Sequence, residues 1–116
     1  MEEITIWHNS RCSKSRDSLC YLQDKIENPT VFEYLKTPPT LDDIHQLLEK
    51  LNIHAEALIR KGEEVFKSNF KDKKFSEDEW RQILVQHPVL IERPIVIKGN
   101  KAVIGRPIDN VIQLLT

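Results

Sequence analysis

The chain has 116 residues, 40% of them hydrophobic, and its 17 lysine and arginine residues stand against 18 aspartate and glutamate residues. This length and apolar content suit one compact domain, expected over residues 1–116, with its own core. The formal net charge of −1 provides no overall field that would favour nucleic acid or an anionic membrane. We therefore expect neither as a partner, and we expect a monomer in which any anion binds locally.

The amino terminus, Met1-Glu2-Glu3, is acidic, whereas a secretory signal begins with basic residues. No apolar run approaches the roughly 18 residues that a membrane helix needs. A cytoplasmic location is therefore expected, where thiols are kept reduced. The four histidines lie far apart in the sequence and form no chelating pair with each other or with Cys20. No metal site is predicted.

The first part of the chain is typical of a strand, a helix and a second strand. Ile4–Trp7 is a short apolar run, and apolar residues then recur at helical spacing between Ser15 and Glu27. Asn28-Pro29 breaks that helix, and Thr30–Leu35 is rich in β-branched and aromatic residues. This order predicts a parallel, right-handed βαβ unit.

The middle of the chain reads as helical once the prolines of "KTPPT" have ended the sheet pattern. Capping and helix-breaking signals place three helices: from Thr40 through Leu51, over His54–Arg60 with an end at Gly62, and from Ser76 to a break at His87-Pro88. Thr40 with Asp43 is an imperfect capping pair, whereas Ser76 with Glu79 is a full capping box. These helices form an all-helical insert at about residues 38–88.

The last part of the chain predicts a hairpin and a helix. Two apolar runs in "PIVIKGNKAVIG" flank Gly99-Asn100, which is a hairpin signal. "PIDNVIQLL" then begins with Pro107 at an expected first helical position. The whole chain therefore predicts an α/β fold in the order βαβ, helical insert, ββα.

Cys12 lies between the first strand and its helix, in the stretch "HNSRCSKSR". The first N–H groups of a helix lack partners within it and carry partial positive charge, so the pKa of a thiol there is expected below the usual value of about 8.5. The N–H groups of Ser13, Lys14 and Ser15 are also placed to hold an oxyanion. His8 is placed to hydrogen-bond within the loop or to tune the thiol, and it is a further candidate for substrate binding. From spacing alone, a cysteine that merely fills buried space is an equal alternative.

Two absences narrow the chemistry of this segment. Position 15 is serine, so Cys12 has no resolving thiol in a Cys-x-x-Cys motif, and an external thiol must reduce it. Ser18 occupies the place where a Cys-x5-Arg phosphate loop would carry arginine, which excludes that loop. Cys20, eight positions after Cys12, is too far along a helix to pair with it, and a structural role is favoured for Cys20.

Five segments, "HNSRCSKSR", "YLKTPPT", "LIRKGE", "HPVLIERPIVI" and "AVIGRP", resemble in order and spacing the glutaredoxin-coupled arsenate reductase family. That resemblance implies a thioredoxin-like fold with a helical insert between its two halves. It also implies that Cys12 is the nucleophile, that Arg60, Arg93 and Arg106 bind the oxyanion, and that Arg93 precedes a cis proline facing the cysteine. Ser10 departs from the family, which usually has proline there and thus a more rigid loop.

The resemblance implies reduction of arsenate to arsenite, with glutathione as co-substrate, glutaredoxin as protein partner and no bound cofactor. Planar guanidinium groups suit such a multiply charged anion because they bind it bidentately and offset its charge. Each arginine also has an ordinary alternative role, at a helix end or on the surface. Two other functions stay open: a monothiol glutathione-dependent oxidoreductase or glutathione-binding protein acting on another substrate or oxyanion, and a thiol-stress regulatory binding module.

Overall fold

The computed structural model describes residues 3–116; Met1 and Glu2 of the acidic amino terminus lie outside the described residues. The chain divides into two compact units. The sheet unit comprises the residues up to Thr37 together with Arg93–Thr116, and the helical unit is Pro38–Glu92. The single domain predicted over residues 1–116 stays a prediction.

The sheet unit contains one four-stranded sheet with the strand order β2-β1-β3-β4. Its strands are β1 (Ile4–Trp7), β2 (Thr30–Phe32), β3 (Ile95–Lys98) and β4 (Lys101–Ile104), and its helices are α1 (Ser13–Lys25) and α5 (Asp109–Leu115). β1 pairs in parallel with β2, while β3 runs antiparallel to both β1 and β4. The predicted α/β order, a βαβ half and a ββα half sharing one sheet as in the thioredoxin-like fold, is confirmed.

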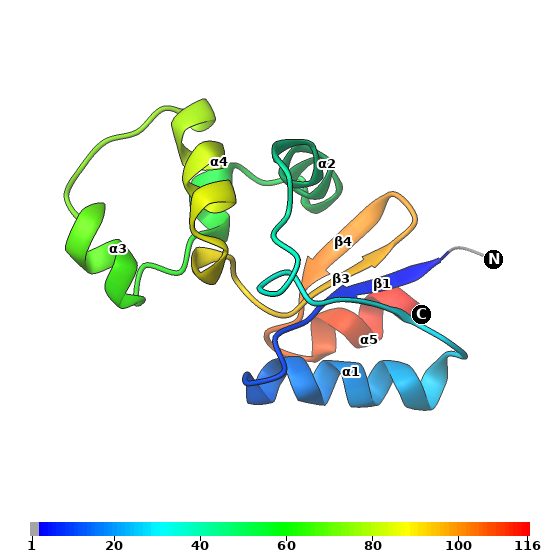
Figure 1. The fold of residues 1–116 in the computed structure, drawn as a ribbon. Helices are drawn as coiled ribbons and strands as arrows, with labels where there is room; N and C mark the ends of the chain where they lie inside the picture. The colour runs from blue at the N-terminus through cyan, green and yellow to red at the C-terminus, as the bar shows by residue number, and fades with distance from the viewer. Residues whose placement is uncertain (1–2) are drawn as a thin grey trace. The chain divides into compact units, whose positions relative to one another are not determined.

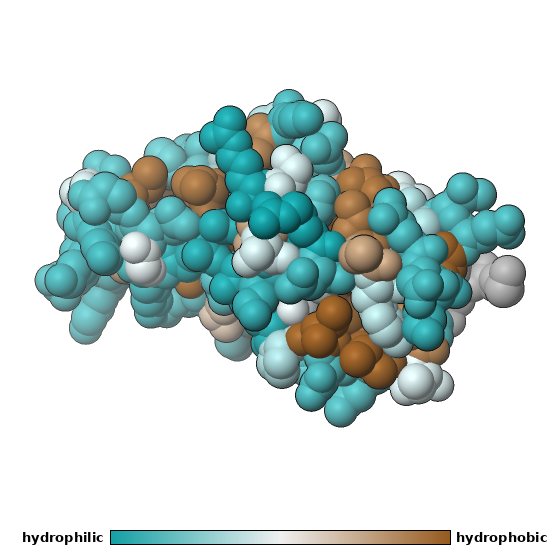
Figure 2. Space-filling view, turned by 90° about the horizontal axis from the view of Figure 1, so that it is seen from below, coloured by the Kyte–Doolittle hydropathy of each residue, from teal (hydrophilic) through white to brown (hydrophobic). Residues whose placement is uncertain are grey.

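One face of the sheet forms the core of this unit. Ile6 of β1 lies opposite Val96 of β3, and both side chains are fully buried with Leu22 of α1 and Val111 of α5. α1 and α5 therefore cover the same face of the sheet (Figure 1). Figure 2 shows the face seen from below Figure 1, where hydrophilic residues predominate and hydrophobic patches also reach the surface.

The second strand is shorter than predicted. β2 ends at Phe32 because its partner β1 ends at Trp7, the residue paired with Phe32. The chain then turns, and the N–H groups of Lys36 and Thr37 both donate to the carbonyl of Glu33. The aromatic residue at position 34, expected in the strand, is instead buried in this turn, with its ring centroid 6.0 Å from that of Trp7.

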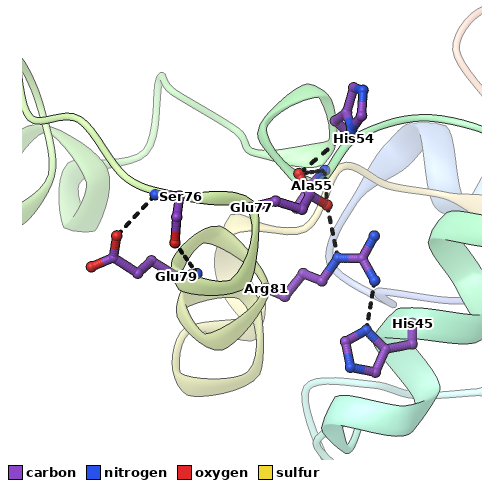
Figure 3. Close-up of polar contacts among 7 residues, drawn as sticks. All are labelled: His45, His54, Ala55, Ser76, Glu77, Glu79 and Arg81. Atoms are coloured by element: carbon purple, nitrogen blue, oxygen red, sulfur yellow. Dashed lines mark hydrogen bonds and ion pairs between the residues drawn. The ribbon is translucent and has the colours of Figure 1, made fainter.

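The helical unit contains three α-helices and two 3-10 turns among its residues: α2 (Leu41–Leu51), η1 (Ala55–Leu58), α3 (Glu64–Asn69), α4 (Glu77–Gln86) and η2 (Pro88–Leu90). The capping box predicted for Ser76 and Glu79 is present at α4, and Thr40 with Asp43, expected as an imperfect pair, forms a full reciprocal box at α2. Figure 3 shows the reciprocal bonds between Ser76 and Glu79.

The prediction of a helix over His54–Arg60 is wrong. Only η1 forms there, because the backbone beyond it is bonded to another segment. Ile59 forms an isolated antiparallel bridge with Ile91, and the N–H of Arg60 donates to Leu90 at 2.7 Å. These bonds replace the helical bonds that would have continued the turn. The chain becomes helical again in α3, which lies just beyond Gly62 and was not predicted.

The hairpin at Gly99-Asn100 is confirmed, and Gly99 has the positive φ of 59° that such turns place on glycine. The last helix begins later than predicted, at Asp109 instead of Pro107. A tight turn precedes it, in which the N–H of Asn110 donates to the carbonyl of Pro107. Pro107 therefore opens the turn and lies just before the helix.

Candidate active site

Cys12 is the residue that caps the N-terminus of α1. Its backbone is extended, with φ −95° and ψ 122°, as is usual for the residue just before a helix. Its N–H donates to the carbonyl of Asn9 at 3.0 Å, which closes the loop after β1. The side chain is 8% exposed. The sulfur is therefore held at a helix N-terminus, where the macrodipole favours an anion.

Two arginines from the far end of the chain reach this sulfur. Arg106, 94 positions away, donates from Nη2 to Cys12 Sγ at 3.1 Å. The side chain of Arg93 also hydrogen-bonds the thiol. Arg106 Nε donates to the carbonyl of Arg93 at 2.7 Å, so the two arginines are linked to each other as well as to the sulfur. The sheet unit thus brings together three of the four residues predicted as catalytic.

The two arginines each precede a cis proline. The Arg93–Pro94 peptide bond is cis, as the resemblance implied. The Arg106–Pro107 bond is also cis, which was not predicted.

The pKa of Cys12 lies below the ordinary value for a thiol, as predicted. Burial raises the pKa, but donors to the sulfur outweigh burial: the backbone N–H of Ser15, the guanidinium groups of Arg93 and Arg106, and the backbone N–H of Lys14. Each of these donors stabilises the thiolate more than the thiol. The predicted binding of an oxyanion by the N–H groups of Ser13, Lys14 and Ser15 stays a prediction; those of Lys14 and Ser15 contact the sulfur.

His8 acts within the loop, bonded to Ser15. Its Nδ1 lies 2.7 Å from Ser15 Oγ, and the same hydroxyl accepts from the N–H of Asn9 at 3.0 Å. Burial lowers the pKa of His8; the charge of Glu33 raises it and that of Arg16 lowers it, with a net decrease. A neutral ring accepts at Nδ1, so the assignment consistent with these bonds has Ser15 donating to His8.

The cysteine loop is held by more bonds than sequence reasoning found. Asn9 accepts the N–H of Arg11 at its side-chain oxygen at 3.0 Å, an Asx turn, and Arg16 Nη1 donates to the carbonyl of Ser10 at 2.9 Å. These bonds fix the loop at the position where the family usually has proline. An asparagine in a loop just before a helix, as at Asn9, is the sequence signal that could have predicted this Asx turn.

Arg60 belongs to the helical unit. Its Nε lies 3.1 Å from Glu63 Oε1 and its Nη1 lies 3.6 Å from Glu92 Oε1. Its side chain is 22% exposed. Two carboxylates therefore offset its charge within its own unit, and its predicted place at the oxyanion stays a prediction.

Cys20 does not have the packing role that was favoured for it. Its side chain is exposed on α1, because the buried face of the helix is formed by Ser15, Ser18 and Leu22. Within residues 3–116, His, Cys, Asp and Glu side chains form no group of three or more that could hold a metal ion. Every helix in that range is too short or too polar to cross a membrane.

Comparison with known proteins identifies relatives over nearly the whole chain. The ArsC family matches residues 7–114. The arsenate reductase of Escherichia coli K12 is 36% identical over 116 residues, covering 99% of this chain and 82% of that protein. YfgD, an uncharacterised protein of the same strain, is 39% identical over 116 residues, covering 98% of each. The solved structure of an arsenate reductase from Vibrio cholerae has a TM-score of 0.90 at 36% identity, covering 97% of each chain.

Proposed function

The chain belongs to the ArsC family, and from that premise we propose that it reduces arsenate to arsenite, with Cys12 as the nucleophile. The observation that carries the proposal is the 3.1 Å bond from Arg106 to the sulfur of Cys12. The two residues are 94 positions apart in the sequence. A guanidinium bonded to a thiolate activates the nucleophile and supplies positive charge where an oxyanion must approach it. The names of the relatives support arsenate as that oxyanion.

In the first step, the Cys12 thiolate attacks arsenic(V) and a sulfur–arsenic bond forms while one oxygen leaves as hydroxide or water. Arg93 and Arg106 offset the repulsion between the thiolate and the arsenate oxygens. The N–H groups of Ser13, Lys14 and Ser15 bind the oxyanion at the helix N-terminus.

In the second step, the thiolate of glutathione attacks the adduct at the Cys12 sulfur. The electron pair of the sulfur–arsenic bond stays with arsenic, which becomes arsenic(III) and leaves as arsenite. The two sulfur atoms are oxidised to a mixed disulfide. Glutaredoxin then takes the glutathione group and restores the Cys12 thiol. An external reductant of this kind suits a segment with Ser15 in place of a second cysteine.

His8 positions this chemistry through Ser15. The His8 ring holds the Ser15 hydroxyl at 2.7 Å, and the Ser15 N–H is the donor that lowers the Cys12 pKa most. His8 is therefore a positioning residue in the proposal, acting on the backbone that contacts the sulfur. Arg60 is the third oxyanion-binding arginine of the proposal, because the family resemblance implies that role.

The test is arsenite formation in the presence of glutathione and glutaredoxin. We expect Cys12→Ser and Arg93→Ala to abolish it, and Cys20→Ser, which changes the exposed cysteine, to retain it. Without glutaredoxin, the Cys12–glutathione mixed disulfide is expected to accumulate. Glutathionylation of Cys12 without any arsenite would refute the proposal in favour of a monothiol oxidoreductase with another substrate.

Arg60 needs its own comparison, and its neighbour provides the control. Lys61 carries the same charge and pairs with Glu56 at 2.7 Å. Because removal of one oxyanion donor costs about 100-fold in rate, Arg60→Ala is expected to lower kcat/KM by about that factor. Lys61→Ala is expected to leave it within about twofold. Equal effects of the two variants would remove Arg60 from the proposed site.

A further inference from the structure

The turn that carries Arg106 lies against the segment that carries Arg93. Beyond the last ladder pair, Ile95 with Ile104, the N–H of Gly105 donates to the carbonyl of Pro94 at 2.8 Å. Gly105 and Pro94 therefore face each other directly, each next to one of the arginines bonded to Cys12.

Gly105 occupies a space that admits no side chain. A Cβ atom there would lie 2.8 Å from Cγ of Pro94, 3.0 Å from Oγ of Ser18 and 3.2 Å from Cγ2 of Val111. The proline ring cannot rotate away as a flexible side chain would, and all three neighbours are buried. Any substitution at position 105 must therefore move the Arg106 turn and the Pro94 segment apart.

Asn110 fixes the same turn from the side of α5. Its Nδ2 donates to the carbonyl of Ile104 at 2.9 Å and to that of Arg106 at 3.3 Å. Both partners are acceptors, so the amide nitrogen is the atom that faces them. One side chain thus holds the backbone on both sides of Gly105.

These contacts matter because the Arg106 guanidinium is bonded at two points. It donates to the carbonyl of Arg93 at 2.7 Å and to the sulfur of Cys12 at 3.1 Å. The donors of a planar guanidinium have fixed spacing, so both bonds form together at one placement of the guanidinium, and a displacement of the turn forces the side chain away from its present conformation or weakens one of the bonds.

We propose that Gly105 and Asn110 are positioning residues that set the reactivity of Cys12 by holding the Arg106 guanidinium against its sulfur. Gly105 acts by lacking a side chain, and Asn110 acts through its two bonds to the backbone. The inference rests on the proposed function in one respect, that the thiolate of Cys12 is the nucleophile.

The test is the rate of alkylation of Cys12 by iodoacetamide as a function of pH, in a Cys20→Ser background so that one thiol reacts. In Gly105→Ala we expect the rate at pH values below the Cys12 pKa to fall about tenfold and the pH profile to move to higher pH, as loss of one charge-assisted hydrogen bond to the thiolate predicts. Asn110→Ala is expected to shift it in the same direction by about threefold. Circular dichroism and the melting temperature report folding separately.

Gly62→Ala is the matched control, because a Cβ at Gly62 would meet nothing within 4 Å. Its alkylation profile is expected to equal that of the parent. In the double variant Gly105→Ala/Arg106→Gln, the rate is expected to equal that of Arg106→Gln alone, since Gly105 acts through Arg106. A general structural role for Gly105 would instead give additive losses.

A folded Gly105→Ala variant with the parent profile overturns the proposal, and so does an equal loss of rate in Gly62→Ala. If Gly105→Ala does not fold, a parent-like profile for Asn110→Ala overturns it. Alkylation needs no arsenate, so this inference and the proposed function can fail separately. A parent protein that alkylates rapidly but forms no arsenite would end the proposed function alone.

Discussion

Replacement of Arg106 by glutamine is the most direct probe of the cysteine site. A hydrogen bond to a charged group contributes about 1.5–3 kcal/mol, and the low end applies because solvent reaches the exposed Arg106 side chain. About 1.5 kcal/mol corresponds to about a tenfold smaller thiolate fraction at pH values below the pKa. Arg106 favours the charged form of Cys12, so its removal raises the pKa and moves the alkylation profile to higher pH.

Iodoacetamide alkylation in the Cys20→Ser background measures this change, and Arg11→Gln is the control. Arg11 directly precedes Cys12 and is exposed. Its bond to Asn9 comes from the backbone N–H, so the substitution removes the same charge and keeps that bond. We expect less than a twofold effect for Arg11→Gln. The reasoning is refuted if the two variants slow alkylation equally, or if Arg106→Gln reacts like the parent.

Three further predictions concern stability. Ser15→Ala leaves the buried Nδ1 of His8 without its 2.7 Å partner and should lower the free energy of unfolding by about 1–3 kcal/mol in urea titration; an unchanged midpoint would contradict this role. Gly99→Ala places a side chain at φ 59° and should lower the free energy of unfolding by about 1–2 kcal/mol in the same titration. An unchanged free energy of unfolding would argue against a positive φ at this hairpin turn. Burial raises the pKa of Glu77, but the bonds from Arg81 and from the N–H of Ala55, together with the charges of Arg81 and His54, outweigh burial and lower it (Figure 3). Glu77→Gln should therefore lower the free energy of unfolding by up to about 1 kcal/mol at pH values above the unfolded-state pKa of about 4.3. This loss should vanish as the pH falls through the lower folded-state pKa. A loss that persists at acid pH would be inconsistent with the ionised pair.

Signals carried by adjacent residues predicted much of the fold. The capping boxes at Thr40 and Ser76 and the hairpin at Gly99-Asn100 depend on side chains within a few positions of the backbone groups they serve. Prediction was wrong where a distant segment supplied the backbone partner. The bridge between Ile59 and Ile91 replaced a helix, and the end of β1 shortened β2.

The exposure of Cys20 was also decided by tertiary packing. Its position along the helix was known, but which side of α1 faces the sheet depends on the contact of Leu22 with Ile6 and Val96. The helical spacing of the apolar residues indicated this face, and the structure adds the polar side chains of Ser15 and Ser18 to its buried part.

The sequence by itself determined the chemistry available at Cys12: a thiol at the start of a helix, without a second thiol three positions later, in a chain that resembles the ArsC family. Only the tertiary structure decided that Arg106 donates directly to the sulfur and that Gly105 leaves room for the Pro94 segment. The physical reason is the separation along the chain between the residues that interact. Helix capping acts between neighbours in the chain, whereas a bond between residues 94 positions apart exists only after the sheet has fixed both backbones.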